Sequence, residues 1–401
     1  MTAATFHLGM LSPIEVADYR ELLDCGSLRP DLPRGMGATP VNLLCRELLA
    51  RGQHLTLFTL DPDVHDEVVL EGANLRICIG PYGGPPTRRP ARDFFAAERR
   101  YLLGAIARER PDVLHAQWTY LYALAAQASG LPHVITAHDA PLRVLPYDLT
   151  PYRIAHTLMA FRVLSRARHV VSVSPYVATH LRRWMLCRGA REVIPNGMSE
   201  RVFSRTTSRP GRDGAVTYAT ILNAWAGLKN GQAALSAFAE VRLRRPSDRL
   251  LMIGHMHGPG GPAETWAKSH GLDAGVRFAG YLPYEETLTL LAEQVDVLVH
   301  PSLEESFGMA LLEASAMAIP VIAGKRSGAV PWTLDGGRSG ILVDVTSARA
   351  LAEAMLELGE SEKLRIEWGA RARANALRRF HVRAVADAYL ETYQRLLEAA
   401  T

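Results

Sequence analysis

Short apolar runs alternate with amphipathic stretches along most of the chain, and this alternation constrains the fold more than any other feature. Apolar runs of about 4–8 residues predict buried strands, whereas longer stretches with apolar residues at helical spacing predict helices. Strands that alternate with helices form a parallel sheet covered by helices on both faces. The pattern runs to about residue 196 and restarts at Val216, and 401 residues are too many for one ordinary core. We therefore predict an α/β fold with two doubly wound domains.

The predicted strands of the first half are Phe6–Leu11, Leu55–Leu60, Leu75–Ile79, Val113–Gln117, His133–Ala137, Val170–Ser174 and Glu192–Ile194. Those of the second half are Val216–Ile221, Leu250–Ile253, Val276–Phe278, Val295–His300, Pro320–Ala323 and Ile341–Val343. Helices are expected between them, for instance at Val41–Arg51, Phe94–Arg110, Tyr152–Arg166, Val177–Leu186 and Asn230–Arg244. The polar segment from Ser204 to Asp213 predicts a linker, with the boundary near residue 208.

Composition excludes several classes of protein. The chain is 48% apolar and 21% charged, which is typical of a globular protein, and a net charge of +4 does not call for nucleic acid. The four cysteines show no metal-ligand spacing and indicate free thiols in a reducing compartment. No signal segment and no apolar run of about 20 residues is present, so we expect a cytoplasmic protein. Arginine outnumbers lysine 41 to 4, which makes each lysine noteworthy.

The stretch from Val297 to Ala318 carries the strongest indication of function. A buried strand ends at His300, and apolar residues at helical spacing predict a helix that begins near Gly308. The first N–H groups of such a helix have no internal partner, and with the helix dipole they favour an anion such as a phosphate. Glu313 lies eight residues after Glu305, and helical side chains lean toward the N-terminus. Two carboxylates beside a phosphate site suit sugar hydroxyls as hydrogen-bond donors, so the stretch predicts a nucleotide-sugar site.

The sequence from His300-Pro-Ser through Glu305-Ser-Phe-Gly to Glu313 resembles the paired-glutamate signature of retaining glycosyltransferases of family 4. Gly328, Gly340–Val343 and Ile194-Pro-Asn-Gly197 are similar to the family as well. The resemblance implies the GT-B fold, with two Rossmann-like domains facing each other across a cleft. It implies an acceptor-binding domain at 1–208 and a nucleotide-sugar-binding domain at 209–382. The last helix, Arg383–Glu398 within residues 383–401, is expected to pack back on the first domain.

The resemblance also assigns roles in the second half. It places Glu305 on the transferred sugar, Glu313 on the ribose, and the helix end with Phe307, Gly308 and Met309 on the diphosphate. Lys229 matches the family's diphosphate-binding lysine and would offset the charge of the leaving group. The family's arginine is replaced by about Asn223, so one diphosphate contact is either weaker or supplied by another group, for which Arg326 is a candidate. Tyr281 and Leu282 fall in the nucleobase region, where Tyr281 either stacks on the base or covers the sheet.

In the first half, His138 matches the family's histidine that faces the sugar, and we count it with Glu305 and Lys229 as a catalytic candidate. His115 and Trp118 end the preceding strand and are either structural or part of an acceptor pocket. Gly37 follows the first long loop and either approaches the diphosphate or forms a plain turn before a helix. Asp139 either orients His138 or caps the next segment.

These residues predict retaining transfer of a sugar from a nucleoside-diphosphate sugar, a UDP- or GDP-sugar, to a hydroxyl of a glycan, glycolipid or small metabolite. The helix dipole and Lys229 would hold the diphosphate, so no metal is expected, and no permanently bound cofactor is expected either. Two alternatives are a catalytically silent nucleotide-sugar-binding partner and a nucleotide-sugar 2-epimerase on the same fold. A nicotinamide dehydrogenase is disfavoured, because no strand runs into GxGxxG with an acid about 20 residues on.

The sequence leaves the acceptor and the oligomeric state open. The region Pro85–Tyr101 is basic and could meet an acidic glycan, a lipid phosphate or the inner face of a membrane, or it is a solvated surface. Its arginines are Arg88, Arg89, Arg92, Arg99 and Arg100.

Overall fold

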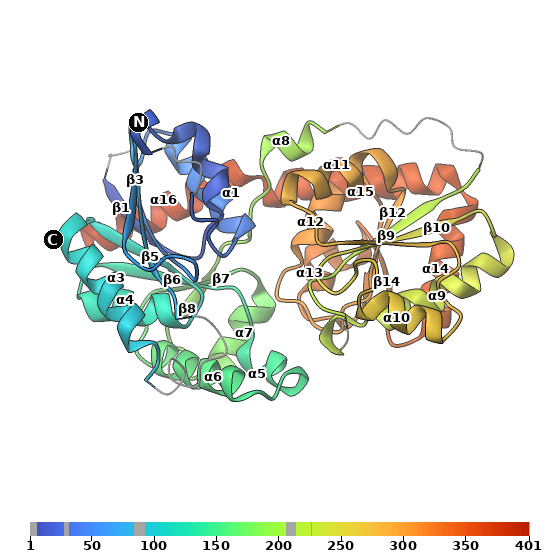
Figure 1. The fold of residues 1–401 in the computed structure, drawn as a ribbon, viewed down its shortest axis with the longest axis horizontal. Helices are drawn as coiled ribbons and strands as arrows, with labels where there is room; N and C mark the ends of the chain where they lie inside the picture. Colours follow the sequence, from blue (N-terminus) through green and yellow to red (C-terminus); the bar gives the residue numbers. More distant parts are fainter. Residues whose placement is uncertain (1–5, 28–31, 84–92, 206–213, 226, 401) are drawn as a thin grey trace. The chain divides into compact units, whose positions relative to one another are not determined.

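The computed structural model describes residues 6–27, 32–83, 93–205, 214–225 and 227–400, and the chain forms two compact units (Figure 1). Unit 1 comprises residues Met1–Gly197 and Val382–Thr401, and unit 2 comprises Met198–His381. The expected boundary near residue 208 lies outside the described residues and stays a prediction. Residues 198–205 already belong to unit 2, where Arg373 donates a hydrogen bond to the carbonyl of Phe203 (2.6 Å).

Unit 1 contains an eight-stranded sheet in the order β3-β4-β2-β1-β5-β6-β7-β8. All neighbours are parallel except β3, which pairs antiparallel with β4 and which the sequence analysis did not predict. The strands are β1 His7–Leu11, β2 His54–Asp61, β3 Val68–Gly72, β4 Leu75–Pro81, β5 Val113–Gln117, β6 His133–Ala137, β7 Val170–Ser172 and β8 Ala190–Val193. Strands β2 and β5 are buried on both faces, as expected for parallel strands between two helical layers.

The helices of unit 1 cover this sheet (Figure 1). They are α1 Thr39–Ala50, α3 Ala96–Glu109, α4 Leu121–Ser129, α5 Pro141–Val144, α6 Pro151–Leu164, α7 Pro175–Trp184 and α16 Val382–Glu398, with short 3-10 turns η1 Val16–Leu22, η2 Cys25–Ser27 and η3 Leu145–Tyr147. Helix α16 belongs to unit 1 although it follows unit 2 in the chain. It buries Val385, Tyr389, Tyr393 and Leu396 in the same core as Leu8 of β1.

Unit 2 contains a six-stranded parallel sheet in the order β11-β10-β9-β12-β13-β14. The strands are β9 Thr217–Ile221, β10 Arg249–Ile253, β11 Val276–Gly280, β12 Val297–His300, β13 Val321–Gly324 and β14 Ile341–Val343. The helices are α8 Glu200–Phe203, α9 Gly231–Arg244, α10 Pro262–Ser269, α11 Tyr284–Gln294, α12 Met309–Ala316, α13 Val330–Thr333, α14 Ala348–Glu360 and α15 Glu362–Phe380, with 3-10 turns η4 Gly227–Lys229 and η5 Asp335–Gly337. The prediction of two parallel-sheet α/β domains is confirmed.

The strand order of each sheet reverses at one point. In unit 2 the chain runs outward from β9 through β10 to β11, then returns to the other side of β9 and continues through β12 to β14. In unit 1 the same reversal lies between β1 and β5. In open α/β sheets, ligands bind at the carboxyl ends of the strands at such a switch point. The loops after β9 and β12, and those after β1 and β5, are therefore the places to look for a site.

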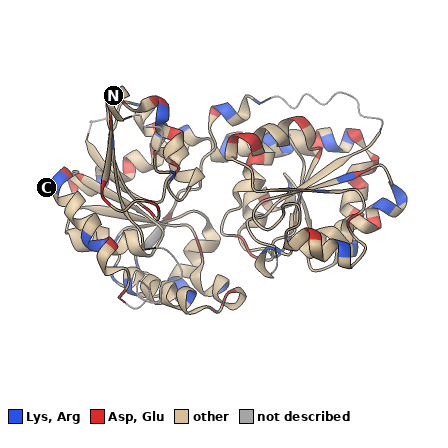
Figure 2. Cartoon of the chain, in the orientation of Figure 1, with Lys and Arg blue, Asp and Glu red and all other residues tan. Residues whose placement is uncertain are grey.

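Charged residues lie mainly on the helices and loops of each unit, with both signs interspersed (Figure 2). Within the part of the chain that the structure describes, no helix is both long and apolar enough to cross a bilayer.

Candidate functional site

The loop from Pro301 to Gly308 connects β12 to α12 at the switch point of unit 2. Three hydrogen bonds hold its backbone in place. Ser327 Oγ donates to the carbonyl of Ser302 (2.6 Å), Thr333 Oγ1 donates to that of Phe307 (2.8 Å), and the N–H of Ala329 donates to that of Glu305 (2.8 Å). The loop that carries Glu305 is thus held in place by the segment after β13.

The Glu305 side chain lies in this loop between two nitrogen donors. Its Oε1 accepts hydrogen bonds from Lys229 Nζ (2.5 Å) and from His300 Nε2 (3.0 Å). Burial by itself would raise the pKa of Glu305, but the charge of Lys229 and the hydrogen bond from His300 outweigh it and hold the pKa well below its usual range. Glu305 is therefore a carboxylate at any pH near neutrality. His300 was not predicted as the partner of Glu305, although a polar residue at the end of a buried strand was a visible signal.

Lys229 is positioned by the residue that follows it. Asn230 adopts a left-handed conformation (φ 52°), and its Nδ2 donates to the carbonyls of Pro301 (3.1 Å) and Val345 (2.9 Å). The carbonyl of Leu228, on the other side of Lys229, accepts from the N–H of Leu303 (2.8 Å). The loops after β9 and β12 are thereby joined, and the structure brings Lys229 and Glu305 together as an ion pair.

Glu313 lies in the second turn of α12 and is buried, with 6% of its surface exposed. Burial raises the pKa of Glu313 to about 7, although a hydrogen bond from Tyr284 opposes the shift. The two acids of the predicted pair therefore differ in charge, since Glu305 is fully ionised and Glu313 titrates near neutrality. Tyr284, the first residue of α11, was not predicted.

Helix α12 begins directly after Gly308, as predicted. Gly308 precedes the first turn of α12 with a φ of 89°, and a Cβ there would lie 2.6 Å from Leu311 Cδ1. Met309 is the first helical residue and is partly exposed. The side chain of Phe307 is buried between Trp332 and Phe380, so only its backbone could face a ligand.

The remaining predicted residues of unit 2 lie at the same edge of the sheet. Asn223 is exposed in the loop after β9, and Arg326 is exposed in the loop after β13. Tyr281 follows β11, is 45% exposed, and stacks on His255 with ring centroids 4.6 Å apart. Leu282 is half-buried beside it. Tyr281 and His255 therefore form an open aromatic surface that a nucleobase could cover.

In unit 1, His138 directly follows β6 and is half-buried. Its Nε2 lies 2.7 Å from Oε1 of Gln117, the last residue of β5. Its ring packs on Trp118, with centroids 4.4 Å apart, and Trp118 has a φ of 63°, which is uncommon outside glycine. Burial lowers the pKa of His138 to about 3, so the imidazole is neutral.

Asp139 and Gly37, two further candidates of unit 1, each have a hydrogen-bond partner within that unit. Asp139 accepts a hydrogen bond from the Tyr120 hydroxyl (2.5 Å), and among the described residues no hydrogen bond joins it to His138. Gly37 (φ 64°) is exposed two residues before α1, and its N–H donates to the carbonyl of Ile14 (3.1 Å). It therefore anchors the loop after β1.

The basic region is only partly described. Arg88, Arg89 and Arg92 lie outside the described residues. Arg99 donates to the carbonyls of Phe94 (2.9 Å) and Asp93 (3.1 Å), so its guanidinium supports the start of α3. Arg100 is exposed on the same helix.

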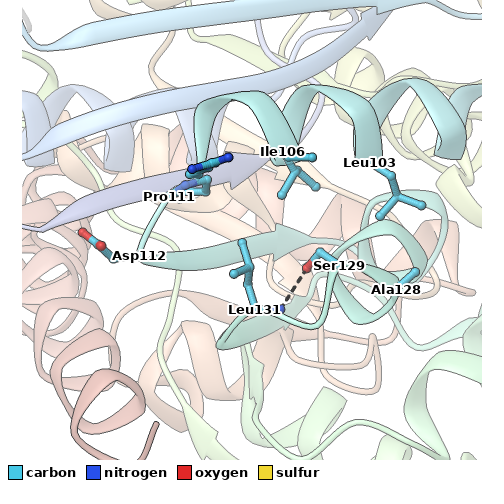
Figure 3. A pocket seen from close by; sticks show the side chains of 9 residues that line it. Leu103, Ile106, Pro111, Asp112, Ala128, Ser129 and Leu131 are labelled. Atoms are coloured by element: carbon cyan, nitrogen blue, oxygen red, sulfur yellow. Dashed lines mark hydrogen bonds between the residues drawn. The ribbon is translucent and has the colours of Figure 1, made fainter. Parts of the chain in front are cut away.

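Unit 1 also has a hollow that lies away from the predicted site residue His138 (Figure 3). It is bounded by Leu103 and Ile106 of α3 and by Ser129 and Leu131 at the end of α4. Leu131 and Asp112 precede β6 and β5, so the hollow lies at the amino ends of these strands, opposite the edge that carries His138. It is not the predicted site.

Within the described residues, no group of three or more His, Cys, Asp or Glu side chains is arranged to hold a metal ion. The four cysteines are free thiols. That the diphosphate is held without a metal stays a prediction.

Two family models match the chain, one in each half. The model "Glycosyltransferase Family 4" matches residues 38–201, and "Glycosyl transferases group 1" matches residues 213–375. Together they cover most of the chain. The chain belongs to glycosyltransferase family 4. The second match spans Lys229, Glu305 and Glu313, and the first spans His138, so each predicted catalytic residue lies inside a matched segment. Neither match tests the pairing of the two glutamates.

Curated relatives of this family 4 chain include a D-inositol 3-phosphate glycosyltransferase of Corynebacterium jeikeium. It is 34% identical over 221 residues, which is 52% of each chain. The chain thus spans about half the length of the curated relative in this match.

Solved structures give the fold. A sucrose-phosphate synthase from Thermosynechococcus elongatus aligns with a TM-score of 0.76 at 20% identity, over 98% of this chain and 100% of the other. Anabaena HepE in complex with UDP-glucose aligns with a TM-score of 0.67 at 16% identity, over 97% of this chain and 100% of the other. These likenesses confirm the GT-B type of fold.

Proposed function

We propose that this protein transfers a sugar, with retention of its anomeric configuration, from a nucleoside-diphosphate sugar to a hydroxyl. The single observation that carries the proposal is the preformed end of α12. There an ionised Glu305 held by Lys229 and His300, a buried Glu313 and an N-terminal helix end occur together at the switch point of unit 2.

The donor is proposed to bind across this helix end. The first N–H groups of α12 and the ammonium of Lys229 suit a diphosphate, because both carry positive charge. Glu313 suits the ribose hydroxyls and Glu305 suits a hydroxyl of the sugar, since carboxylates accept strong hydrogen bonds. The aromatic surface of His255 and Tyr281 suits the base. A UDP-sugar is the first donor to test, because HepE, which shares the fold, was solved with UDP-glucose.

Lys229 has two roles in this proposal. Its ammonium forms an ion pair with Glu305. A diphosphate beside it would compete for the ammonium and, as the bond to the sugar breaks, would gain charge that the ammonium stabilises. The oxygen of the leaving phosphate can take the proton of the acceptor hydroxyl, so no dedicated base is required. His138, neutral at pH 7, is proposed to hold a hydroxyl of the transferred sugar.

The acceptor is proposed to be a hydroxyl of a glycan, a glycolipid or a small metabolite. Inositol 3-phosphate is the first to test, because the C. jeikeium relative is named for it. A UDP-sugar and a GDP-sugar should each be incubated with the protein, with and without this acceptor, and product formation followed by NMR. The proposal expects release of the nucleoside diphosphate only when acceptor is present, and a product that keeps the donor's anomeric configuration.

Other results of the same experiment would overturn parts of the proposal. An inverted product would exclude retention. An epimerised nucleotide sugar formed without acceptor would indicate a 2-epimerase. Tight donor binding without turnover across a panel of acceptors would indicate a catalytically silent binding partner.

A further inference from the structure

A chain of hydrogen bonds runs from the C-terminal helix α16 to His138, all within unit 1. The Tyr393 hydroxyl lies 2.6 Å from His115 Nδ1, and Gln117 Nε2 lies 3.0 Å from His115 Nε2. Gln117 Oε1 lies 2.7 Å from His138 Nε2. Tyr393, which is 278 positions after His115 in the sequence, is thus connected to His138 through two side chains of β5.

The inner members of this chain are sealed from water. Tyr393 and His115 are fully buried, and Gln117 is 2% exposed. Buried polar groups need partners within the protein, because water cannot satisfy them. Burial, reinforced by the nearby His138, also lowers the pKa of His115 to about 3, so its imidazole is neutral. A neutral imidazole has one nitrogen that donates and one that accepts.

The amide of Gln117 couples the two rings. Its oxygen only accepts and its nitrogen only donates, so the ring nitrogens that face the two arms must be of opposite kind. With the oxygen toward His138, His138 Nε2 carries a proton and His115 Nε2 is bare. His115 Nδ1 then carries its proton and donates to the Tyr393 oxygen.

A second branch agrees with this assignment. Thr136 Oγ1 lies 2.7 Å from His115 Nε2 and 2.9 Å from the Tyr389 hydroxyl. The Tyr389 hydroxyl can donate to Thr136, and the Thr136 hydroxyl can donate to the bare His115 Nε2. The second amide hydrogen of Gln117 faces Met10 Sδ (3.3 Å). The Gln117 amide and the Thr136 hydroxyl then share the one lone pair of His115 Nε2, and the Tyr393 hydroxyl hydrogen has no acceptor in this network.

We propose that Gln117, His115 and Tyr393 are positioning residues that fix which ring nitrogen of His138 carries the proton. His138 Nε2 carries the proton and donates it to Gln117 Oε1. His138 Nδ1 is therefore left to accept a hydrogen bond from a hydroxyl of the substrate. This inference rests on the proposed function, in which His138 holds a sugar hydroxyl. The tautomer itself can be measured without any reaction.

The first test measures the tautomer. Nitrogen-15 NMR of the full-length protein distinguishes protonated from bare ring nitrogens, and a His138→Gln variant assigns the signals. We expect wild-type His138 to show a protonated Nε2 and Gln117→Leu to shift it toward a mixture of both tautomers. Tyr393→Phe, the milder variant, should shift His115 and, to a smaller extent, His138. In the Gln117→Leu background, Tyr393→Phe should leave His138 unchanged, because the connection is already cut.

The second test measures kinetics with the donor and acceptor found above. Gln117→Leu should lower kcat about tenfold, the effect of roughly one hydrogen bond, while KM for the donor changes less than about twofold. Tyr218→Phe is the matched control, because its buried hydroxyl donates to the carbonyl of Met355 (2.8 Å) in unit 2, and it should leave kcat unchanged.

The outcomes separate the two proposals. An unchanged His138 spectrum in both Gln117→Leu and Tyr393→Phe overturns the positioning role, whatever the kinetics show. A shifted spectrum together with full activity of His138→Ala leaves the coupling intact and overturns the role of His138 in transfer.

Discussion

At the scale of single residues, the two glutamates of the α12 region share a residue type but differ in charge. Glu305 has two nitrogen donors on one oxygen, and Glu313 has burial with a single hydroxyl donor. Their surroundings therefore move their pKa values in opposite directions. A carboxylate that is always charged suits a group beside a developing positive sugar, whereas one near neutrality suits a hydroxyl partner that binds and leaves.

Replacing Glu305 by glutamine should abolish transfer. We expect at least about a hundredfold loss of kcat, as for removal of a preorganised electrostatic group, with nucleoside-diphosphate affinity changed less than about threefold. Kinetics and calorimetry would measure the two quantities. Glu353→Gln is the control, since Glu353 is an exposed acid of α14 paired with Arg349. Undiminished turnover of Glu305→Gln would show that this carboxylate is not required.

Replacing Glu313 by glutamine should change how stability depends on pH. The pKa of Glu313 is about 7 in the folded state, and that of an unperturbed glutamate is 4.5, so between these pH values the folded state binds more protons than the unfolded state. Stability then falls as pH rises through this window, by up to about 3 kcal/mol from this residue. Glu313→Gln lacks the ionisation, so its melting temperature relative to wild type should rise between about pH 5 and pH 8. A constant difference across that range would contradict the shift.

At the scale of elements, the proposed donor site consists of strand β12, the loop that follows it and helix α12. The segment after β13 holds this loop in place. Strand β12 is buried throughout its length, so the loop starts from a fixed point. A Cβ on Gly328 would lie 2.3 Å from the carbonyl of Glu305, so the segment after β13 can approach the loop only because this residue is glycine. The segment after β13 therefore packs directly against the loop that precedes α12.

Gly308→Ala should damage this helix end. Alanine at a φ of 89° is strained, and its Cβ would lie 2.6 Å from Leu311 Cδ1, so we expect a loss of roughly 1–3 kcal/mol in stability and weaker nucleotide binding. Gly271→Ala is the matched control, because Gly271 also has a positive φ (65°) but nothing lies within 4 Å of its Cβ position. Urea unfolding and calorimetry would measure both variants. Equal nucleotide affinity in Gly308→Ala and wild type would argue against a role for the helix end.

At the scale of the whole molecule, the chain leaves unit 1 at Gly197 and returns to it at Val382. The returning helix α16 fills the core of unit 1 and supplies the tyrosines that lie beside His115. Unit 2 is one continuous segment with its own core around Tyr218, Phe238 and Leu351. The two units therefore depend on the C-terminus to different degrees.

Ending the chain at His381 should unfold unit 1 and spare unit 2. The four large side chains of α16 in the core each contribute about 1.5–3 kcal/mol of burial, which together approach the total stability of a typical domain. Hydrogen exchange should show lost protection in residues 6–194 and retained protection in residues 216–375. Removing only residues 399–401, after the end of α16, is the control. Persistent protection of residues 6–194 without α16 would contradict this division.

Most strands and helices, and the chemical character of the site residues, could be predicted from the sequence. The period of the apolar residues is set by local backbone geometry, so β12, α12 and the parallel character of both sheets could be predicted. Strand β3 was missed because it is short, only partly buried and antiparallel at a sheet edge. The type of residue at each strand end, as with Glu305, Lys229 and His138, was equally visible in the sequence.

Which side chains meet, and which of them are charged, depends on the folded arrangement of the chain. The contacts of Lys229 with Glu305, of Tyr284 with Glu313, and of Gln117 with His138 join segments whose separation in the sequence carries no periodic signal. The pKa values of Glu305 and Glu313 depend on burial and on charges brought close by folding. Electrostatic and hydrogen-bonding energies fall off over a few ångströms in space, and a sequence records only the order of residues along the chain.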